Sequence, residues 1–249
     1  MTQSLLGRAA LVTGASSGVG EVTALALAAA GAKVAIAARR ADRLTALKAR
    51  IQALGGEAEV IVADFAREAE AAEAVHRAEE SFGRLDILVN NAGVMYLEPV
   101  ADADLARWRH MLELNVLGLI AASQAALAGM RARRCGDIVN ISSTAGRIAN
   151  PNGAGYSATK FGVVAFTEAL RKEVYKDRVR LTVIEPGIVE TELREHVAHE
   201  EARKTINAFA AAVRQLQPED VANAVLFAVS QPPHVSINEI LMRPTDQER

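Results

Sequence analysis

Short apolar runs alternate along the chain with longer segments of helical periodicity. The short runs are mostly apolar throughout, which is typical of strands covered on both faces of a parallel sheet. Seven of them predict strands, at residues 9–13, 33–38, 59–63, 87–90, 138–141, 180–184 and 237–242. No linker, low-complexity segment or internal repeat divides the 249 residues. The pattern therefore predicts an α/β fold, with a single doubly wound domain over 1–249 and helices on both faces of the sheet.

Two segments between the strands carry an apolar face at helical spacing, over residues 44–54 and 105–119. The second face is interrupted by the polar Asn115, which marks that residue as a functional candidate. Trp108 lies in the same face, and we interpret it as a core or subunit contact rather than a platform for a substrate.

The first predicted strand runs directly into the sequence TGASSGVG. Glycines there let the backbone turn tightly, and the N-terminus of the following helix offers free N–H groups to a pyrophosphate. The spacing differs from the generic G-x-G-x-x-G fingerprint, and an ordinary glycine-rich turn is the alternative. The strand–turn–helix context favours a dinucleotide site of the Rossmann type. Its predicted residues are Gly14, Ser16, Ser17, Gly18, Val19 and Gly20.

The end of the second strand bears on which dinucleotide binds. NAD sites place an acidic residue there, which would repel a 2′-phosphate, but this chain has Ala38 followed by Arg39 and Arg40. A guanidinium binds phosphate through charge-assisted hydrogen bonds, so this arrangement favours NADP. The alternative is that both arginines only open a solvated helix.

The sequence YSATK places Tyr156 four residues before Lys160, and this spacing puts both side chains on one helix face. A phenol is a poor base at neutral pH, because its ordinary pKa is about 10. An ammonium close to it favours the phenolate, so we expect Lys160 to lower the pKa of Tyr156. Such a pair can exchange a proton with a carbonyl or an alcohol.

Six segments occur in order over residues 13–187: TGASSGVG, NNAG, LELNVLG, ISS, YSATK and IEPG. Together they resemble the short-chain dehydrogenase/reductase family. The resemblance implies a Rossmann fold with about seven parallel strands. It also implies an NADP-dependent oxidoreductase that interconverts a carbonyl compound and its alcohol, and the charge-rich segment VETELREHVAHEEARK after IEPG favours a small polar aldehyde or ketone over a large apolar substrate.

The resemblance also implies catalytic roles. Tyr156 would be the acid/base, and Lys160 would lower its pKa and bind the nicotinamide ribose. Ser143 would hydrogen-bond the substrate oxygen, with the neighbouring Ser142 as the less favoured candidate. Asn115 would stabilise a helix distortion and a water that leads protons towards Lys160.

Further positions would contact the cofactor. Asp64 would bond the adenine amino group, and Asn90 would support the sheet and contact the adenosine ribose. Ser17 stands where NADP-binding members often carry a basic residue, which leaves Arg39 most of the phosphate recognition. The remaining predicted cofactor residues are Phe65, Asn91, Ala92, Gly93, Pro186, Gly187, Ile188 and Thr191.

The C-terminal part bears on the substrate and on assembly. Residues 188–217 would form a substrate-binding lid, with Ser143, Met95 and Arg194 as substrate contacts. Arg194 would meet a carboxylate; alternatively, it pairs with Glu190 or Glu195. The ending VSINEILMRPTDQER resembles that of a subgroup which includes clavulanic acid dehydrogenase and the serine and 3-hydroxy acid dehydrogenases. The family resemblance implies a homo-oligomer, a tetramer or a dimer.

The net charge and the composition give no evidence for a nucleic acid, a membrane or a metal as a partner. The net charge of −2 gives no excess of positive charge for a nucleic acid or an anionic membrane. Cys135 is the only cysteine, and the N-terminus lacks a long apolar segment. No charge-free apolar stretch approaches the ~18 residues of a membrane span, so we expect a cytoplasmic protein. His196 and His199 lack a third ligand, and we expect no metal.

Two other functions are compatible with some of these motifs. A sugar-nucleotide epimerase or dehydratase uses the same Tyr/Lys pair, but usually has a longer C-terminal substrate part than the segment after Gly187 here. A non-catalytic NADP-binding regulator would not need Asn115, Ser143, Tyr156 and Lys160 together.

Overall fold

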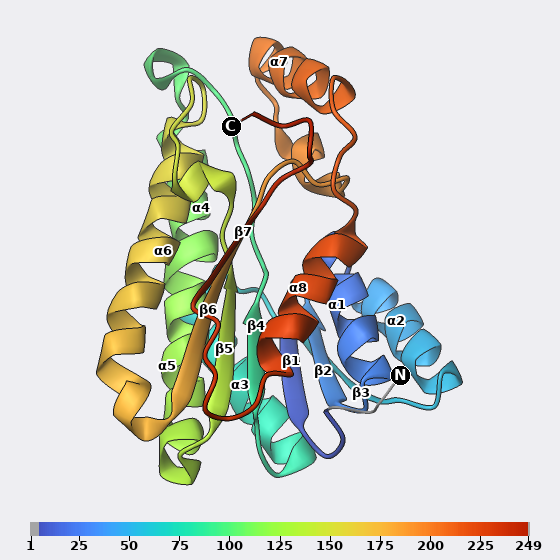
Figure 1. Ribbon diagram of the computed structural model, residues 1–249. Coiled ribbons are helices and arrows are strands. Elements are labelled where there is room, and N and C mark those ends of the chain that lie inside the picture. Colours follow the sequence, from blue (N-terminus) through green and yellow to red (C-terminus); the bar gives the residue numbers. More distant parts are fainter. Residues whose placement is uncertain (1–4, 249) are drawn as a thin grey trace.

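The computed structural model describes residues 5–248, which form one sheet of seven parallel strands in the order β3-β2-β1-β4-β5-β6-β7 (Figure 1). The strands are β1 (Ala9–Thr13), β2 (Lys33–Ala38), β3 (Glu57–Val62), β4 (Ile87–Asn90), β5 (Gly136–Ile141), β6 (Val179–Pro186) and β7 (Glu239–Met242). The chain crosses outward from β1 to β3 and then returns to place β4 on the other side of β1. Ligands of such sheets bind at this reversal, at the carboxyl ends of the strands.

Helices cover both faces of the sheet, as expected. One face carries α1 (Gly18–Ala29), α2 (Ala41–Ala53) and α8 (Pro218–Val229). The other carries α3 (Glu68–Phe82), α4 (Leu105–Leu112), α5 (Gly118–Arg133) and α6 (Ala154–Val174) (Figure 1). Leu11 and Val12 of β1 point into the two opposite apolar clusters, and both are fully buried. This burial on both sides explains why the strand sequences are apolar throughout.

The helices α4 and α5 join through a π-helical turn, η2 (Glu113–Leu117), into one apolar run, Leu105–Arg133. By length and composition this run is long enough to cross a membrane, whereas we expected no such segment. In the structure 44% of its most apolar window is buried, and its inner face packs in the core beside α3. Packing in the core accounts for the apolar residues of that inner face.

Above the carboxyl ends of the strands lie the 3-10 helix η5 (Glu192–His196) and helix α7 (Glu200–Ala211). Figure 1 shows α7 standing clear of both helical layers, beside the C-terminal segment. The predicted lid, residues 188–217, thus consists of η5, α7 and their connections. Residues 1–4, part of the N-terminus in which we expected no long apolar segment, lie outside the described part of the chain.

Candidate active site

A cavity of about 830 Å³ opens at the carboxyl ends of the strands, beneath the lid. It is lined by every residue predicted from the sequence to bind cofactor or substrate or to act in catalysis, except Gly20, Asn90 and Asn115. The topology therefore brings together residues that lie up to 180 positions apart, from Gly14 to Arg194. The sequence did not predict some of the lining, which includes the loop at Asn150, Pro151 and Asn152 and the C-terminal Gln247.

The glycine turn between β1 and α1 is packed too closely for side chains. A Cβ atom on Gly20 would lie 2.5 Å from the carbonyl oxygen of Gly14, and one on Gly14 would lie 2.8 Å from Cα of Ala92. The Asn91 amide donates to the carbonyl of Thr13 at 3.0 Å. Gly20 thus packs against the side of the turn that faces away from the cavity, which explains why it does not line the cavity.

At the end of β2, Arg40 rather than Arg39 is held against the glycine turn. Its Nε donates to Ser16 Oγ at 3.0 Å, and its Nη2 donates to Ser17 Oγ at 2.7 Å. Arg39 also lines the cavity but is exposed, and no hydrogen bond holds its side chain to another residue of the described chain. The arginine that the structure holds beside Ser17 is therefore Arg40, whereas the sequence indicated Arg39.

The same corner contains an ion pair from the lid. Glu192 of η5 accepts a hydrogen bond from Arg40 Nη1 at 3.0 Å and another from Arg43 Nη1 at 2.7 Å. The hydrogen bond from Arg43, and then that from Arg40, lowers the pKa of Glu192 to about 2. Arg43 follows Arg40 by three positions at the start of α2. This spacing is the only feature of the sequence that indicates that both arginines can contact one carboxylate.

Tyr156 and Lys160 lie in the first two turns of α6, and both are buried, with 7% of each residue exposed. Nζ of Lys160 donates to the carbonyl of Ile141 at 2.9 Å and lies 5.7 Å from the centre of the Tyr156 ring. Ser143, at the end of β5, lines the cavity and hydrogen-bonds the phenol. The hydroxyl of Ser142 instead donates to the backbone carbonyl of Lys160, at 3.1 Å.

The pKa of Tyr156 differs in direction from our expectation. Burial raises it to about 12, and the hydrogen bond with Ser143 lowers it only in part. Burial lowers the pKa of Lys160 to about 8. The ammonium was expected to lower the phenol pKa, but here desolvation dominates because both groups are shielded from water.

Asn115 lies behind the cavity, within the π-helical turn η2. Its Oδ1 accepts from the backbone N–H of Val94 at 2.9 Å, and its Nδ2 donates to the Val94 carbonyl at 2.9 Å and to Thr159 Oγ1 at 3.2 Å. The side chain therefore joins the distorted helix to the loop after β4 and to α6. The expected helix distortion is present, and the proton-carrying water stays a prediction.

Over the lid end of the cavity, Arg194 pairs with neither Glu190 nor Glu195. Its Nη2 donates to Gln215 Oε1 at 2.9 Å, and its Nε is buried without a hydrogen-bond partner in the described chain. His199 caps α7, with Nδ1 accepting from Ala202 N. Within residues 5–248 no three His, Cys, Asp or Glu side chains group as a metal site.

The residues present fit a nicotinamide dinucleotide. The turn between β1 and α1 exposes backbone next to a helix N-terminus and tolerates no Cβ at its closest contacts. Ala38 leaves the end of β2 without a carboxylate, and Arg40 is fixed beside the turn. At the other end of the same cavity, Tyr156 and Ser143 present two hydroxyl groups to a reacting oxygen. A nucleotide-binding oxidoreductase is the class of protein that such a cavity defines.

Comparisons with known proteins agree. A family model described as short chain dehydrogenase matches residues 8–202. Glycine betaine reductase from Emericella nidulans is 40% identical over 243 residues, which cover 98% of this chain but only 19% of that protein. An uncharacterized oxidoreductase from Staphylococcus saprophyticus is 34% identical, with 95% of this chain and 96% of the relative covered.

Solved structures show the same relationship. Serine dehydrogenase in a closed form with NADP⁺ is 36% identical, with a TM-score of 0.88 over 97% of this chain and 96% of that chain. A metagenomic short-chain oxidoreductase in complex with NADP is 31% identical, with a TM-score of 0.83 over 98% and 100% of the two chains. The chain belongs to the short-chain dehydrogenase/reductase family. It is an oxidoreductase that acts on alcohol or carbonyl groups with a nicotinamide cofactor.

Proposed function

We propose that this protein is an NADP(H)-dependent reductase of a small polar aldehyde or ketone, with Tyr156 as the acid/base. The observation that carries the proposal is one cavity with two chemical ends. At one end Arg40 is anchored beside the glycine turn, and at the other Tyr156, Ser143 and Lys160 converge. The NADP complexes among the solved relatives support the choice of cofactor.

The residues of the chain divide the chemistry between them. A bound nicotinamide dinucleotide supplies the hydride in reduction or accepts it in oxidation. Tyr156 holds its proton at neutral pH, because its pKa is about 12, and can donate it to the substrate oxygen during reduction. Ser143 orients that oxygen by a hydrogen bond. The charge of Lys160 stabilises the phenolate that forms when the proton leaves.

Cofactor preference and product identity test this proposal. With an aldehyde and ketone panel, NADPH should be favoured over NADH by about tenfold to hundredfold, because a charge-assisted contact contributes ~1.5–3 kcal/mol. Arg39→Ala and Arg40→Ala should each raise the KM for NADPH and leave that for NADH nearly unchanged. Arg67→Ala, which changes an exposed arginine outside the cavity, is the control.

Two results would contradict the proposal. Equal use of NADPH and NADH by the native enzyme would exclude the phosphate preference. Tyr156→Phe should bind NADPH normally and lose turnover; substantial turnover in this variant would place the acid/base elsewhere. Product analysis separates a reductase from an epimerase or dehydratase, which returns its cofactor unchanged.

We further propose that the substrate bears a carboxylate and that Arg194 binds it. The guanidinium lines the cavity, is held by the neutral Gln215 and has no carboxylate partner in the described chain. A planar guanidinium binds both oxygens of a carboxylate. The inward face of α7 carries Ile206 and Phe209, which would pack against the apolar part of a small substrate.

An acid and its methyl ester provide the test. The native enzyme should reduce a carboxylated aldehyde about tenfold or more efficiently than the ester, as expected for one charged hydrogen-bonding contact. Arg194→Ala should remove this difference by raising the KM for the acid. Arg203→Ala, an exposed substitution on α7, should preserve it. If the native enzyme handles acid and ester equally, the substrate has no need of a carboxylate.

A further inference from the structure

The lid is tied to the arginines at the end of β2 by a single carboxylate, that of Glu192. Both oxygens of this carboxylate are used, one by Arg40 at 3.0 Å and the other by Arg43 at 2.7 Å. The residues lie 152 and 149 positions apart in the chain, so the contact joins the lid to the start of α2. Within residues 5–248 no other carboxylate accepts a hydrogen bond from either arginine.

The contact lies beside the glycine turn. Thr191, the residue before Glu192, packs close to Gly18: a Cβ built on Gly18 would lie 3.1 Å from Cγ2 of Thr191. Arg40 is fixed from the other side by Ser16 and Ser17. Glu192 therefore meets the very guanidinium that the fold holds in place beside the nucleotide turn.

Glu192 and a 2′-phosphate would share one partner, the Arg40 guanidinium, which lines the cavity. A phosphate monoester carries about −1.5 to −2 charges at neutral pH and offers three acceptor oxygens to arginines. A carboxylate held against that guanidinium would repel the phosphate, because like charges at such short range do not share one site. NADP and Glu192 are thus expected to exclude one another at Arg40, whereas NAD has no group that competes.

We propose that Glu192 is an internal competitor for the 2′-phosphate and that binding of the phosphate releases η5 from α2. This inference rests on the proposed NADP preference. Glu192 would make the affinity for NADP(H) lower than the arginines alone permit and would couple the presence of the 2′-phosphate to the lid. The lid would then distinguish the two dinucleotides before any substrate binds.

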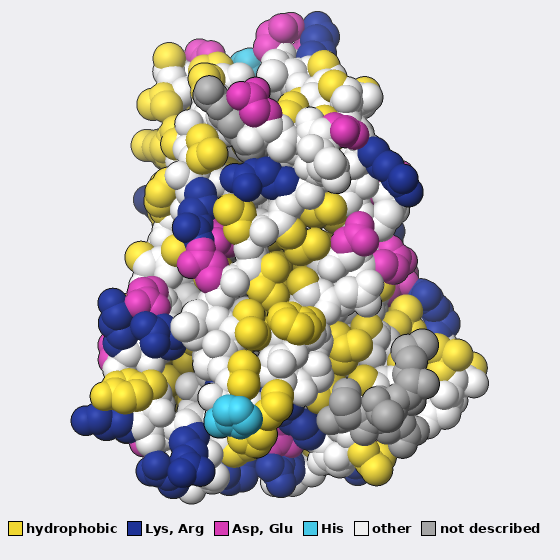
Figure 2. Space-filling view, in the orientation of Figure 1, with side chains coloured by type: hydrophobic (Ala, Val, Ile, Leu, Met, Phe, Trp, Pro, Cys, Tyr) yellow, Lys and Arg dark blue, Asp and Glu magenta, His cyan; other side chains and the backbone are white. Residues whose placement is uncertain are grey.

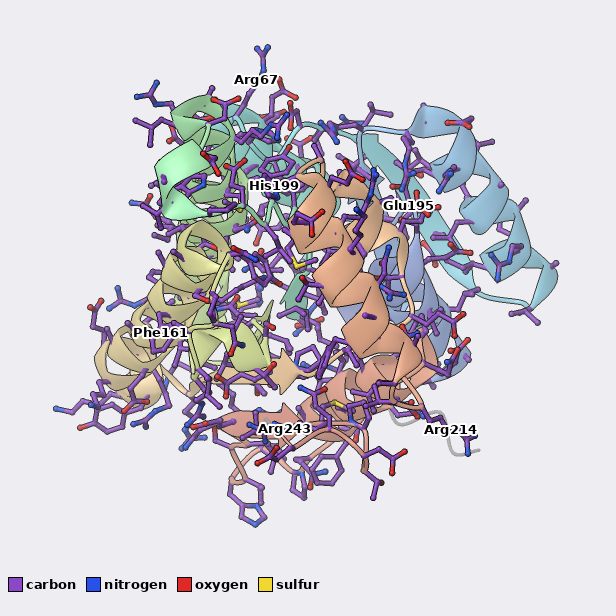
Figure 3. All side chains as sticks on the ribbon, turned by 90° about the horizontal axis from the view of Figure 1, so that it is seen from above. Arg67, Phe161, Glu195, His199, Arg214 and Arg243 are labelled. Carbon is purple, nitrogen blue, oxygen red and sulfur yellow. The ribbon has the colours of Figure 1, made fainter. Side chains whose placement is uncertain are left out.

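The expected effect is modest, because the contact is half exposed. The side chains of Arg40, Arg43 and Glu192 are 41%, 43% and 38% exposed. Exposed ion pairs typically contribute little, so removing both contacts should tighten 2′-phosphate binding by about three- to tenfold. Glu192→Gln keeps the shape of the side chain and removes its charge. Glu195→Gln, which changes an exposed carboxylate on the same short helix, is the control (Figure 3).

Titration calorimetry with two nucleotide fragments isolates the phosphate from all nicotinamide contacts. The probes are adenosine 2′,5′-bisphosphate and adenosine 5′-monophosphate, which differ only in the 2′-phosphate. Glu192→Gln should lower the Kd of the bisphosphate about three- to tenfold and leave that of the monophosphate unchanged. Glu195→Gln should resemble the native protein with both probes. An unchanged or higher Kd for the bisphosphate in Glu192→Gln would overturn the proposal.

Hydrogen exchange gives a second readout that does not depend on activity. In the native protein the bisphosphate should increase amide exchange in the segment 192–196, and the monophosphate should not. In Glu192→Gln that segment should exchange quickly with or without a ligand. Equal protection in both proteins would overturn the release of the lid. If the native protein binds both probes equally, the proposed NADP preference is wrong. The change in the Kd of the bisphosphate from the native protein to Glu192→Gln still tests whether Glu192 competes with the 2′-phosphate.

Discussion

Lys160 should destabilise the folded protein, and replacing it by methionine measures how much it lowers the free energy of unfolding. The residue is 7% exposed, and burial lowers its pKa from 10.5 to about 8. At about 1.4 kcal/mol for each tenfold change in protonation equilibrium, this difference corresponds to about 3 kcal/mol. Methionine has a similar length and no charge, but it loses the hydrogen bond to the Ile141 carbonyl, a loss of about 1–2 kcal/mol. Lys160→Met should therefore be more stable than the native protein by about 1–2 kcal/mol at pH 7, and inactive.

The pH dependence gives the sharper test. The folded pKa of Lys160 lies below the unfolded one, so the unfolded chain binds more protons between about pH 8 and pH 10.5. The native protein therefore gains stability from this residue as the pH rises through that window, and the advantage of Lys160→Met shrinks. Other titrating groups affect both proteins alike and cancel in the difference.

Urea unfolding at pH 7 and at pH 10 checks both expectations. Lys172→Met, which changes an exposed lysine on the same helix, controls for the general effect of removing one positive charge. A variant that is less stable than the native protein at pH 7 would refute the reasoning. So would an advantage that stays constant, or grows, as the pH rises.

Two further predictions follow from buried and exposed groups. In the ligand-free protein Tyr156 should ionise at about pH 12, seen as a late step in tyrosinate absorbance that Tyr156→Phe removes; ionisation below pH 10 would show that burial does not control this phenol. The native protein should form dimers or tetramers through the exposed apolar faces of α4 and α6. On these faces the side chains of Leu112 and Phe161 are 47% and 44% exposed. Apolar atoms also gather at the upper left edge of the molecule in Figure 2. Leu112→Glu with Phe161→Glu should then yield monomers near 26.5 kDa in sedimentation, whereas native protein that already sediments as a monomer would exclude this interface.

The sequence alone was sufficient where the determining interactions are local. The strands β1, β2 and β4 begin and end where their apolar runs predict. The bounds of β3, β5, β6 and β7 differ from the prediction by one or two residues at one or both ends. Both interior strands (β5 and β6) and edge strands (β3 and β7) are among them, because hydrogen bonds to the neighbouring strands set where a strand ends, and the apolar run alone does not contain that pairing. The glycine turn and the Tyr156–Lys160 pair were also recognisable, because their geometry depends on spacing within one turn or one helix.

Only the tertiary structure decided which charges meet and how strongly burial acts on them. Arg40, rather than Arg39, reaches the glycine turn, and Glu192 of the lid contacts it from 152 positions away. Arg194 pairs with Gln215, not with the glutamates beside it in the sequence. The pKa of Tyr156 rises where the neighbouring lysine suggested a fall. Contacts between distant segments and the loss of water around a group depend on how the whole chain packs, and a local sequence pattern does not contain that information.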